Sequence, residues 1–198
     1  MLLTMNSFVG TAVMSLQTGR QLAVIGEPII NPHDLSIMAF YVSGSTVDFN
    51  PAVLFVSDIR EIGHLGIIVD SSDNITSPEG MVRLEEIIGY GFRIFGLKAI
   101  DDHKHKLGVV ENFTFDPNSF HVEQILVKPG FGRRLSVMNL TISRQQVIEV
   151  SNQRLLVKAP DRKVIQKVVK QAENPNSIPF ENPFRKPEIP LSESKNTD

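Results

Sequence analysis

Apolar and polar positions alternate along much of the chain, and the clearest such stretch is residues 97–127. Its apolar runs and polar breaks fall at 97–100, 101–106, 107–115, 116–119 and 120–127. Alternation with a period of two is typical of half-buried strands, and Pro117 in the second break favours a tight turn. The stretch therefore predicts three antiparallel strands joined by two tight turns.

The same pattern occurs 85 residues earlier, and each matched position keeps its chemical character. The pairs are Leu22 and Leu107, Val24 and Val109, Ile30 and Phe115, Asn31 and Asp116, Pro32 and Pro117, Leu35 and Phe120, Ile37 and Val122, Phe40 and Ile125, and Val42 and Val127. Such self-similarity predicts that one β unit is built twice. In both copies the alternation shifts phase before Phe40 and before Ile125. A phase shift predicts a β-bulge, which curls a small sheet towards closure and favours barrels over open sheets.

The remaining apolar runs predict the other strands of each unit. They lie at 8–16 and 21–30, at 52–56 and 65–69, and at 140–142, 147–150 and 155–157, with single turns at Asp58–Glu61 and Ser143–Gln146. The expected fold class is all-β, with two small six-stranded β-barrels in tandem. Because units of this size bury little surface alone, we expect them to pack together.

The segments outside the two units contain two helical patterns. Residues 71–80 are rich in turn formers, and Ser77-Pro78 is an expected helix start, followed by Met81, Leu84, Ile87 and Ile88 at helical spacing. After Pro160, an apolar helical face of valine and isoleucine predicts a C-terminal helix. The expected organisation is a first barrel (1–70), a linker with a short helix (71–91), a second barrel (92–158), a C-terminal helix (159–173) and a disordered proline-rich tail (174–198).

Composition limits the classes of function. The 198 residues include no cysteine, which removes disulfides, thiolate nucleophiles and cysteine zinc sites and suits a reducing compartment. No secretory leader and no apolar run of about 20 residues is evident, so we expect a cytoplasmic protein that is not transmembrane. The net charge of −2 hides an asymmetry, because residues 1–95 sum to −6 and residues 96–170 to +6. The halves therefore face each other, or the basic half meets an anionic partner.

The second unit has a pattern of turn and core residues: Leu107-Gly108-x-Val110-Glu111, Phe115-Asp116-Pro117, Phe120, Ile125-x-Val127, Ile142, Val147-Ile148 and Leu155–Val157. With this pattern the unit resembles the PRC-barrel family. The resemblance covers residues 92–158 and, more weakly, 8–70, where Ala23 replaces Gly108. The family includes the cytoplasmic domain of the photosynthetic reaction-centre H subunit, and a related barrel occurs in a ribosome maturation factor. Because the motif consists of turn glycines and core residues, the resemblance implies a fold and no chemistry.

The loop Lys128–Arg134 is the local feature most typical of a binding site. It places the cations Lys128, Arg133 and Arg134 around Phe131 between two glycines. This combination suits phosphate or single-stranded RNA, an acidic protein surface, or anionic lipid headgroups. The other interpretation is an ordinary loop whose phenylalanine folds onto the barrel.

Other candidate sites carry less chemistry. The tail repeats an apolar anchor at Pro179-Phe180 and Pro183-Phe184, which suits a docking peptide or a plain solubilising end. His103 and His105 follow Asp101 on a turn, where metal binding is opposed by neighbouring lysines. No catalytic or nucleotide-binding motif is present, so we expect no enzyme, no cofactor and no metal.

The leading functional hypothesis is a non-enzymatic adaptor that contacts a protein partner through the basic second barrel and the tail. The alternative is an RNA- or ribosome-associated factor in ribosome maturation. DNA binding is not expected, and homo-oligomerisation is left open.

Overall fold

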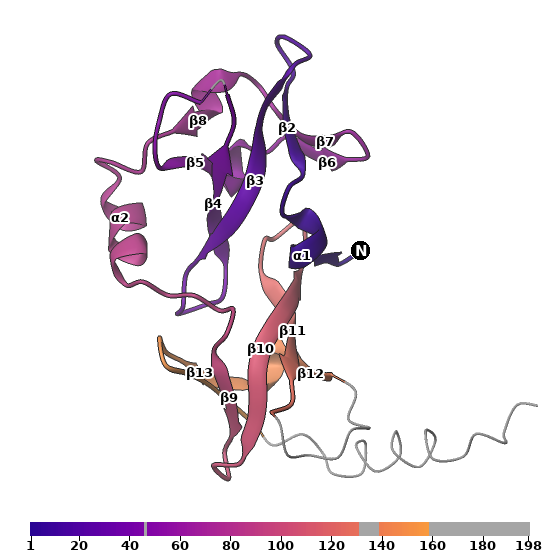
Figure 1. Cartoon of the computed structure of the whole chain (residues 1–198), viewed down its shortest axis with the longest axis vertical. Coiled ribbons are helices and arrows are strands. Elements are labelled where there is room, and N and C mark those ends of the chain that lie inside the picture. Colours follow the sequence, from indigo (N-terminus) through magenta and orange to yellow (C-terminus); the bar gives the residue numbers. More distant parts are fainter. Residues whose placement is uncertain (46, 131–138, 159–198) are drawn as a thin grey trace, which may run out of the picture. The chain divides into compact units, whose positions relative to one another are not determined.

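The chain forms two seven-stranded sheets and few helices, and buried and exposed residues alternate along its strands (Figure 1). The computed structural model describes residues 1–45, 47–130 and 139–158. All of them belong to one compact unit, Met1–Asp161. The expected all-β class is confirmed at this level. The C-terminal helix expected at 159–173 and the tail expected at 174–198 lie outside the described residues.

The first sheet contains the first repeat. Its strands are β2 (Ala12–Ser15), β3 (Gln21–Ile30), β4 (Ile37–Ser43), β5 (Ala52–Phe55), β6 (Glu61–Gly63), β7 (Gly66–Val69) and β8 (Ile75–Thr76), with the 3-10 turns η1 (Val56–Asp58) and η2 (Ser72–Asn74). Neighbouring strands follow the order β6-β7-β2-β3-β4-β5-β8. All neighbours are antiparallel except β2 and β7, which pair in parallel.

The second sheet repeats this arrangement. Its strands are β9 (Lys98–Asp101), β10 (Lys106–Phe115), β11 (Val122–Lys128), β12 (Leu140–Ser143), β13 (Val147–Val150) and β14 (Arg154–Val157), with η3 (Arg144–Gln146) and the added strand β1 (Leu3–Thr4). The order is β12-β11-β10-β9-β14-β13, and β14 pairs with β9 in parallel. The two paths have the same connectivity once β1 and β8 are set aside.

The internal repeat is confirmed down to the register of its long hairpins. On β3 and β4, Pro28 pairs with Phe40 and Ile30 with Ile37. On β10 and β11, the residues 85 positions later form the same pairs, Phe113 with Ile125 and Phe115 with Val122. Both ladders shift register before their last pair, so the predicted bulge is present in β4 and in β11.

The turns of the two long hairpins also match, and they bond to each other. Leu35 and Phe120 both have positive φ, 59° and 53°. The Ile37 N–H donates to the Phe120 carbonyl oxygen (2.8 Å), and the Val122 N–H donates to the Leu35 carbonyl oxygen (3.0 Å). Ser36 and His121 form the antiparallel bridge between them. Each turn therefore accepts one backbone hydrogen bond from the strand that follows the other turn. This reciprocal exchange is the pattern of a twofold contact.

The two repeats share one hydrophobic core, as their small size led us to expect. Phe8 lies against Phe40 of the first repeat and Phe115 of the second, with ring centroids 5.3 and 5.1 Å apart. Phe120 stacks on Phe115 at 6.0 Å and meets Phe40 at 6.4 Å. This aromatic contact is worth roughly 0.5–1.5 kcal/mol per ring pair beyond the buried area.

The amino-terminal segment differs from the expected strand at 8–16. The strand begins at Ala12, and Phe8 instead ends the one-turn helix α1 (Met5–Phe8). Before α1, Leu3 and Thr4 form β1, which pairs with Phe115 and Thr114 of β10. The segment that leads into the first repeat therefore belongs to the sheet of the second, because its apolar side chains complete the shared core.

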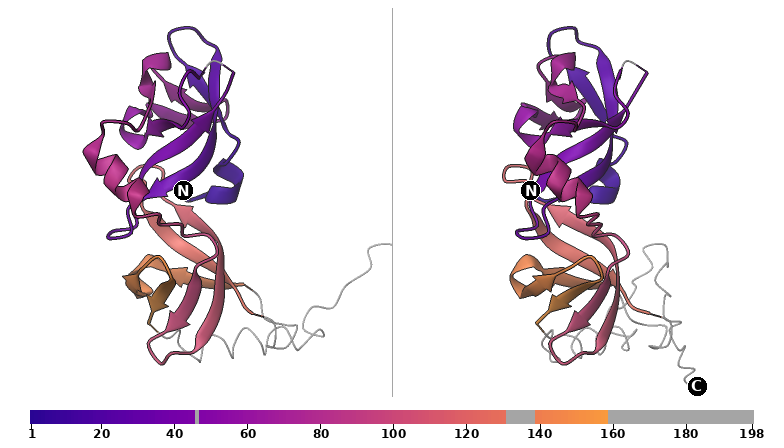
Figure 2. Two further views of the ribbon diagram at one scale, coloured as in Figure 1. Left: turned by 60° about the vertical axis from the view of Figure 1, so that its left-hand side comes forward. Right: turned by 90° about the vertical axis from the view of Figure 1, so that its left-hand side faces the viewer.

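The linker helix is confirmed, but its start was wrongly predicted. Helix α2 (Val82–Gly89) begins after Met81, whereas the Ser77 hydroxyl oxygen accepts the Glu79 N–H within a preceding turn. Its buried Leu84 packs against Ile29, Ala39 and Val53 on the outward face of the first sheet. Figure 2 shows α2, in magenta, against this face. At this place the first repeat has an outward apolar cluster.

The glycine missing from the first repeat is replaced by one on the opposite strand. Gly108 has φ of 151°, and a Cβ there would lie 2.0 Å from the Lys128 carbonyl oxygen. In the first repeat, where Ala23 stands in its place, Gly44 makes the matching approach, and a Cβ on it would lie 2.6 Å from the Leu22 carbonyl oxygen. Both hairpins need one glycine at this crossing, and either strand can supply it.

Two further features bear on the expected barrels and on membranes. The strands β12 and β13 at the two ends of the second path are consecutive in the chain and joined by η3. The strands β5 and β6 of the first sheet are likewise joined by η1, but β8 pairs with β5 and is the end of that path. Within the described ranges neither pair of consecutive strands forms a ladder with each other. The expected closed barrels are therefore not confirmed. No helix in the same ranges is long and apolar enough to cross a membrane.

Candidate functional site

Lys128 is the predicted binding residue that the structure places, and it lies at the end of β11. It pairs across the strand with Val109 of β10, whose side chain is 41 % exposed. Because a Cβ at residue 108 would clash with the Lys128 carbonyl oxygen, Gly108 allows the two strands to approach closely at this point. The lysine is therefore fixed at its backbone while its side chain is exposed.

Lys128 is one end of a row of outward side chains that are paired across neighbouring strands. Val109 pairs with Lys98 of β9, and Lys98 pairs with Arg154 of β14. Residues opposite each other on neighbouring strands project from the same side of a sheet. Arg154, Lys98, Val109 and Lys128 thus cross four adjacent strands as one row, with three cations around an exposed valine.

A second row lies next to the first. Ile100 of β9 pairs with Lys106 of β10 on one side and with Leu156 of β14 on the other. Ile100 and Leu156 are half-buried, whereas Lys106 is exposed. We call the combined surface the basic face: Lys98, Lys106, Lys128 and Arg154 around Ile100, Val109 and Leu156.

Two carboxylates border the basic face and leave it with net positive charge. Lys128 Nζ lies 3.3 Å from Glu111 Oε1, and Arg154 Nη2 lies 3.8 Å from Glu149 Oε2. Both pairs are exposed, so each holds its cation by only about 0–1 kcal/mol. Lys98 and Lys106 have no ion pair within residues 1–130 and 139–158.

The first repeat provides an internal comparison, because the same positions carry no charge there. By strand pairing, Ala12 corresponds to Lys98, Gln21 to Lys106, Ser43 to Lys128 and Gly66 to Arg154. Val24 corresponds to Val109, so the apolar centre of the row is kept. The fold therefore does not require cations at these positions, and the second repeat has four of them.

The other predicted binding residues cannot be placed on this surface. Phe131, Arg133 and Arg134 lie outside the described residues, which resume at Asn139. The tail anchors Pro179, Phe180, Pro183 and Phe184 lie outside them as well.

The histidine turn has a structural role for one of its members. The buried Asp101 carboxylate accepts the His105 backbone N–H (2.7 Å), and its second oxygen lies 2.9 Å from His105 Nδ1. Burial raises the pKa of Asp101, but these hydrogen bonds outweigh it and the pKa is lowered. His103 lies 3.9 Å from the Asp102 carboxylate. Among the described residues, no three acidic, histidine or cysteine side chains gather as a metal site.

Sequence reasoning missed Lys98, Lys106 and Arg154 as partners of Lys128. Arg154 lies 48 residues after Lys106 in the sequence, and the β9–β10 ladder shifts register between Lys106 and Gly108. The positive surplus of the second half does not locate the face, because residues 131–138 and 159–170, outside the described ranges, supply +5 of that +6.

The fold and the basic face define a class, a duplicated β protein with a cationic surface on one repeat. No family model matches the chain, and no curated protein matches it.

Proposed function

We propose that this protein is a non-enzymatic binding protein, an adaptor that docks an acidic protein surface on the basic face of its second repeat. The observation that carries the proposal is the row Arg154–Lys98–Val109–Lys128, whose counterpart in the first repeat is uncharged. Complementary charge steers a partner towards such a face and fixes its orientation. The exposed aliphatic centre then supplies contact area without a charge to desolvate.

The side chains on the basic face favour protein over RNA. Its uncharged members are aliphatic (Ile100, Val109, Leu156), whereas single-stranded RNA is held by stacking on aromatic rings. Glu111 and Glu149 border the face and would repel a continuous phosphate backbone, but they match isolated basic residues on a mixed protein surface. A single patch of this kind suits a modest, salt-sensitive interaction.

An RNA- or ribosome-associated role is the second candidate. Lys98 and Lys106 favour it, because they have no ion pair within the described ranges and are available to phosphate. The two candidates differ in what a nuclease does to the bound material, so one experiment separates them.

The proposal includes the finer fold assignment. Each repeat is taken as a six-stranded PRC-type barrel, supported by the strand order that both repeats share apart from β1 and β8 and by the bulge in each long hairpin. Two such barrels and a linker helix then form a cytoplasmic protein. The absence of cysteine supports that location.

The test replaces two cations with the residues that the first repeat has at the same positions. The full chain and its Lys98→Ala/Lys128→Ser variant are used to capture partners from cell extract at graded salt, with and without nuclease. We expect the wild type to retain a defined acidic protein after nuclease treatment. We expect the variant to lose about tenfold in affinity for it, since each exposed charge contact contributes up to roughly 1 kcal/mol.

The matched control is Arg20→Gln/Arg83→Gln, which makes the same change of net charge at exposed positions of the first repeat and the linker. This control should bind as the wild type does. Loss of the captured material on nuclease treatment would support the RNA candidate instead. Equal binding by both double variants would refute the basic face as the docking site.

A further inference from the structure

The segment that precedes each repeat contacts the long strand of the other repeat. Before the first repeat, β1 pairs with the far end of β10, and the Asn6 N–H donates to Asn112 Oδ1 (3.3 Å). Before the second repeat, Arg93 Nη2 donates to Glu27 Oε1 of β3 (2.6 Å), and Glu27 is the counterpart of Asn112. The two preceding segments therefore contact equivalent positions of the two long strands, but only the segment before the first repeat forms a strand there.

The far end of β3 consequently has a strand on one side alone. Its pairing with β2 stops at Val24, and Ile25 makes the last backbone bonds on that side, with Gly10 and Thr11. Pro28, Ile29 and Ile30 pair only with β4. Their counterparts on β10 pair with β11 and, at Thr114 and Phe115, also with β1. Within this stretch Glu27 is exposed and Pro28 is half-buried, whereas Ile29 and Ile30 are only 5 % and 3 % exposed. A strand edge that lacks a strand partner is a template for another strand.

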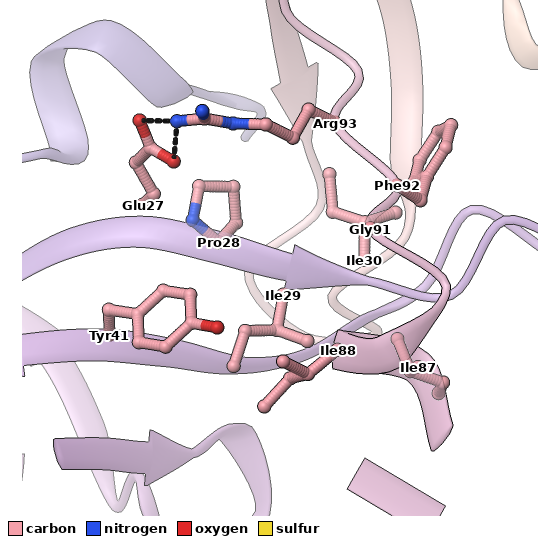
Figure 3. Close-up of a pocket in the computed structure, with 10 residues that line it drawn as sticks. All are labelled: Glu27, Pro28, Ile29, Ile30, Tyr41, Ile87, Ile88, Gly91, Phe92 and Arg93. Atoms are coloured by element: carbon pink, nitrogen blue, oxygen red, sulfur yellow. Dashed lines mark hydrogen bonds and ion pairs between the residues drawn. The ribbon is translucent and has the colours of Figure 1, made fainter. Parts of the chain in front are cut away.

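A hollow of about 220 Å³ lies beside this edge (Figure 3). Pro28, Ile29 and Ile30 of β3 form one wall, Tyr41 of β4 lies alongside, and the remaining lining residues are Glu27, Ile87, Ile88, Gly91, Phe92 and Arg93. Pockets for drug-sized ligands have volumes of about 300–1,000 Å³, so this hollow suits a peptide side chain better than a cofactor.

The chain does not fill the hollow itself because its linker remains helical up to the edge. Helix α2 ends at Gly89, and the Tyr90 and Gly91 N–H groups bond back to Glu86 and Ile88. With these turns, the described part of the linker passes β3 without forming a strand pair with it. The hollow is thus bounded by the end of a helix where β10 has a strand.

We propose that the edge of β3 at Glu27–Ile30 binds an extended peptide segment of a partner protein as an added strand, in the way that β10 binds β1. The inference concerns the first repeat and does not depend on the basic face. Main-chain hydrogen bonds to Glu27, Ile29 and Ile30 provide affinity, since Pro28 has no N–H to donate, and the hollow selects the side chain that enters it.

The occupant is an uncharged segment rich in aliphatic residues. Four of the ten residues that line the hollow are isoleucines, and its one acidic and one basic residue, Glu27 and Arg93, neutralise each other. The protein supplies the precedent, since the strand seated on the equivalent edge has the sequence Leu3-Thr4 between Leu2 and Met5. The Tyr41 hydroxyl has no hydrogen-bond partner among the described residues and can bond to the incoming backbone.

The first test is hydrogen exchange in the free protein. Alternate backbone groups of a strand point to opposite sides, so whichever of the Ile29 and Ile30 amides faces away from β4 should exchange at least about tenfold faster than its counterpart at Thr114 or Phe115, which pair with β1. Equal protection of the two amides would show that the β3 edge is already covered and would overturn the proposal.

The second test uses a synthetic peptide with the sequence of residues 1–7 as the probe and the full-length protein labelled for NMR. Saturable shifts at the Glu27, Ile29 and Ile30 amides are expected. Ile88→Asp places a charge in the hollow and should weaken binding by about tenfold or more, whereas Val82→Asp, at the exposed start of the same helix, should not.

Three outcomes would overturn the proposal: no saturable binding, equal binding by the two variants, or shifts confined to Thr114 and Phe115. The last result would mean that the probe exchanges with β1 on β10. If Ile88→Asp lowers the thermal midpoint, Ile87→Asp replaces it, because Ile87 also lines the hollow.

Discussion

Single residues decide how each hairpin closes. Leu35 and Phe120 adopt the left-handed conformation that β-carbons disfavour, at a cost of roughly 1–2 kcal/mol each. The turn compensates, because each residue donates its N–H to the carbonyl four residues earlier and exposes its carbonyl to the other repeat. Such conformations could not be predicted from apolar side chains, which signal core and not turn. The Asn31 and Asp116 positions with their following prolines did predict that a turn is present.

Gly108 offers a direct test of the close crossing in the second repeat. We expect Gly108→Ala to lower the free energy of unfolding by about 2–4 kcal/mol, because the new methyl group meets the Lys128 carbonyl oxygen and φ of 151° is strained for alanine. Chemical denaturation measures the change. Gly89→Ala is the control, since a Cβ there has no neighbour within 4 Å, and it should leave stability unchanged or slightly raised.

Among the elements, those defined by local periodicity could be predicted, and those defined by distant pairing could not. The long hairpins, their bulges and α2 follow from the alternation and helical spacing of nearby residues. Strand β1 does not, because two residues at the amino terminus pair with residues more than 100 positions away. The basic face belongs to the same category, since a one-residue change of register would turn Lys98 away from Val109.

Leu84 is the one fully buried side chain of helix α2 among the residues that pack on the first sheet. Leu84→Ala removes its buried contact with Ile29, Ala39 and Val53, so we expect a loss of about 2–4 kcal/mol in unfolding free energy and faster amide exchange within α2. Val82→Ala, at a 77 % exposed position of the same helix, should change stability by less than about 0.5 kcal/mol. An equal effect of the two substitutions would contradict the described packing.

At the scale of the whole molecule, the duplication gives two repeats with one core and two different surfaces. The aromatic group Phe8, Phe40, Phe115 and Phe120 draws on both repeats, so neither can complete its interior alone. The outward surfaces differ: the first repeat is covered by α2, and the second has the basic face. The four cations of the basic face lie on one side of the second sheet. They account for little of the charge asymmetry, because residues 131–138 and 159–170, outside the described ranges, supply +5 of the +6 carried by residues 96–170.

Separate expression tests this shared interior. We expect residues 1–91 and residues 92–158 each to lack a cooperative thermal transition at the temperature where the full chain unfolds, because each fragment loses its aromatic partners and the second also loses β1. An equimolar mixture should recover part of the native β-sheet circular dichroism. Two fragments that unfold independently, with midpoints close to that of the full chain, would disprove the interdependence.

The reciprocal bonds between the two hairpin turns have a consequence for self-association. Leu35 presents its carbonyl to Val122 and Phe120 presents its carbonyl to Ile37, so the matching partner is already bound within the same molecule. A contact that closes on itself in this way terminates after one pairing and has no free end to recruit a neighbour. A polypeptide with one such turn deleted would keep an unsatisfied half of this junction, and fibre growth or exchanged dimers would become accessible to it.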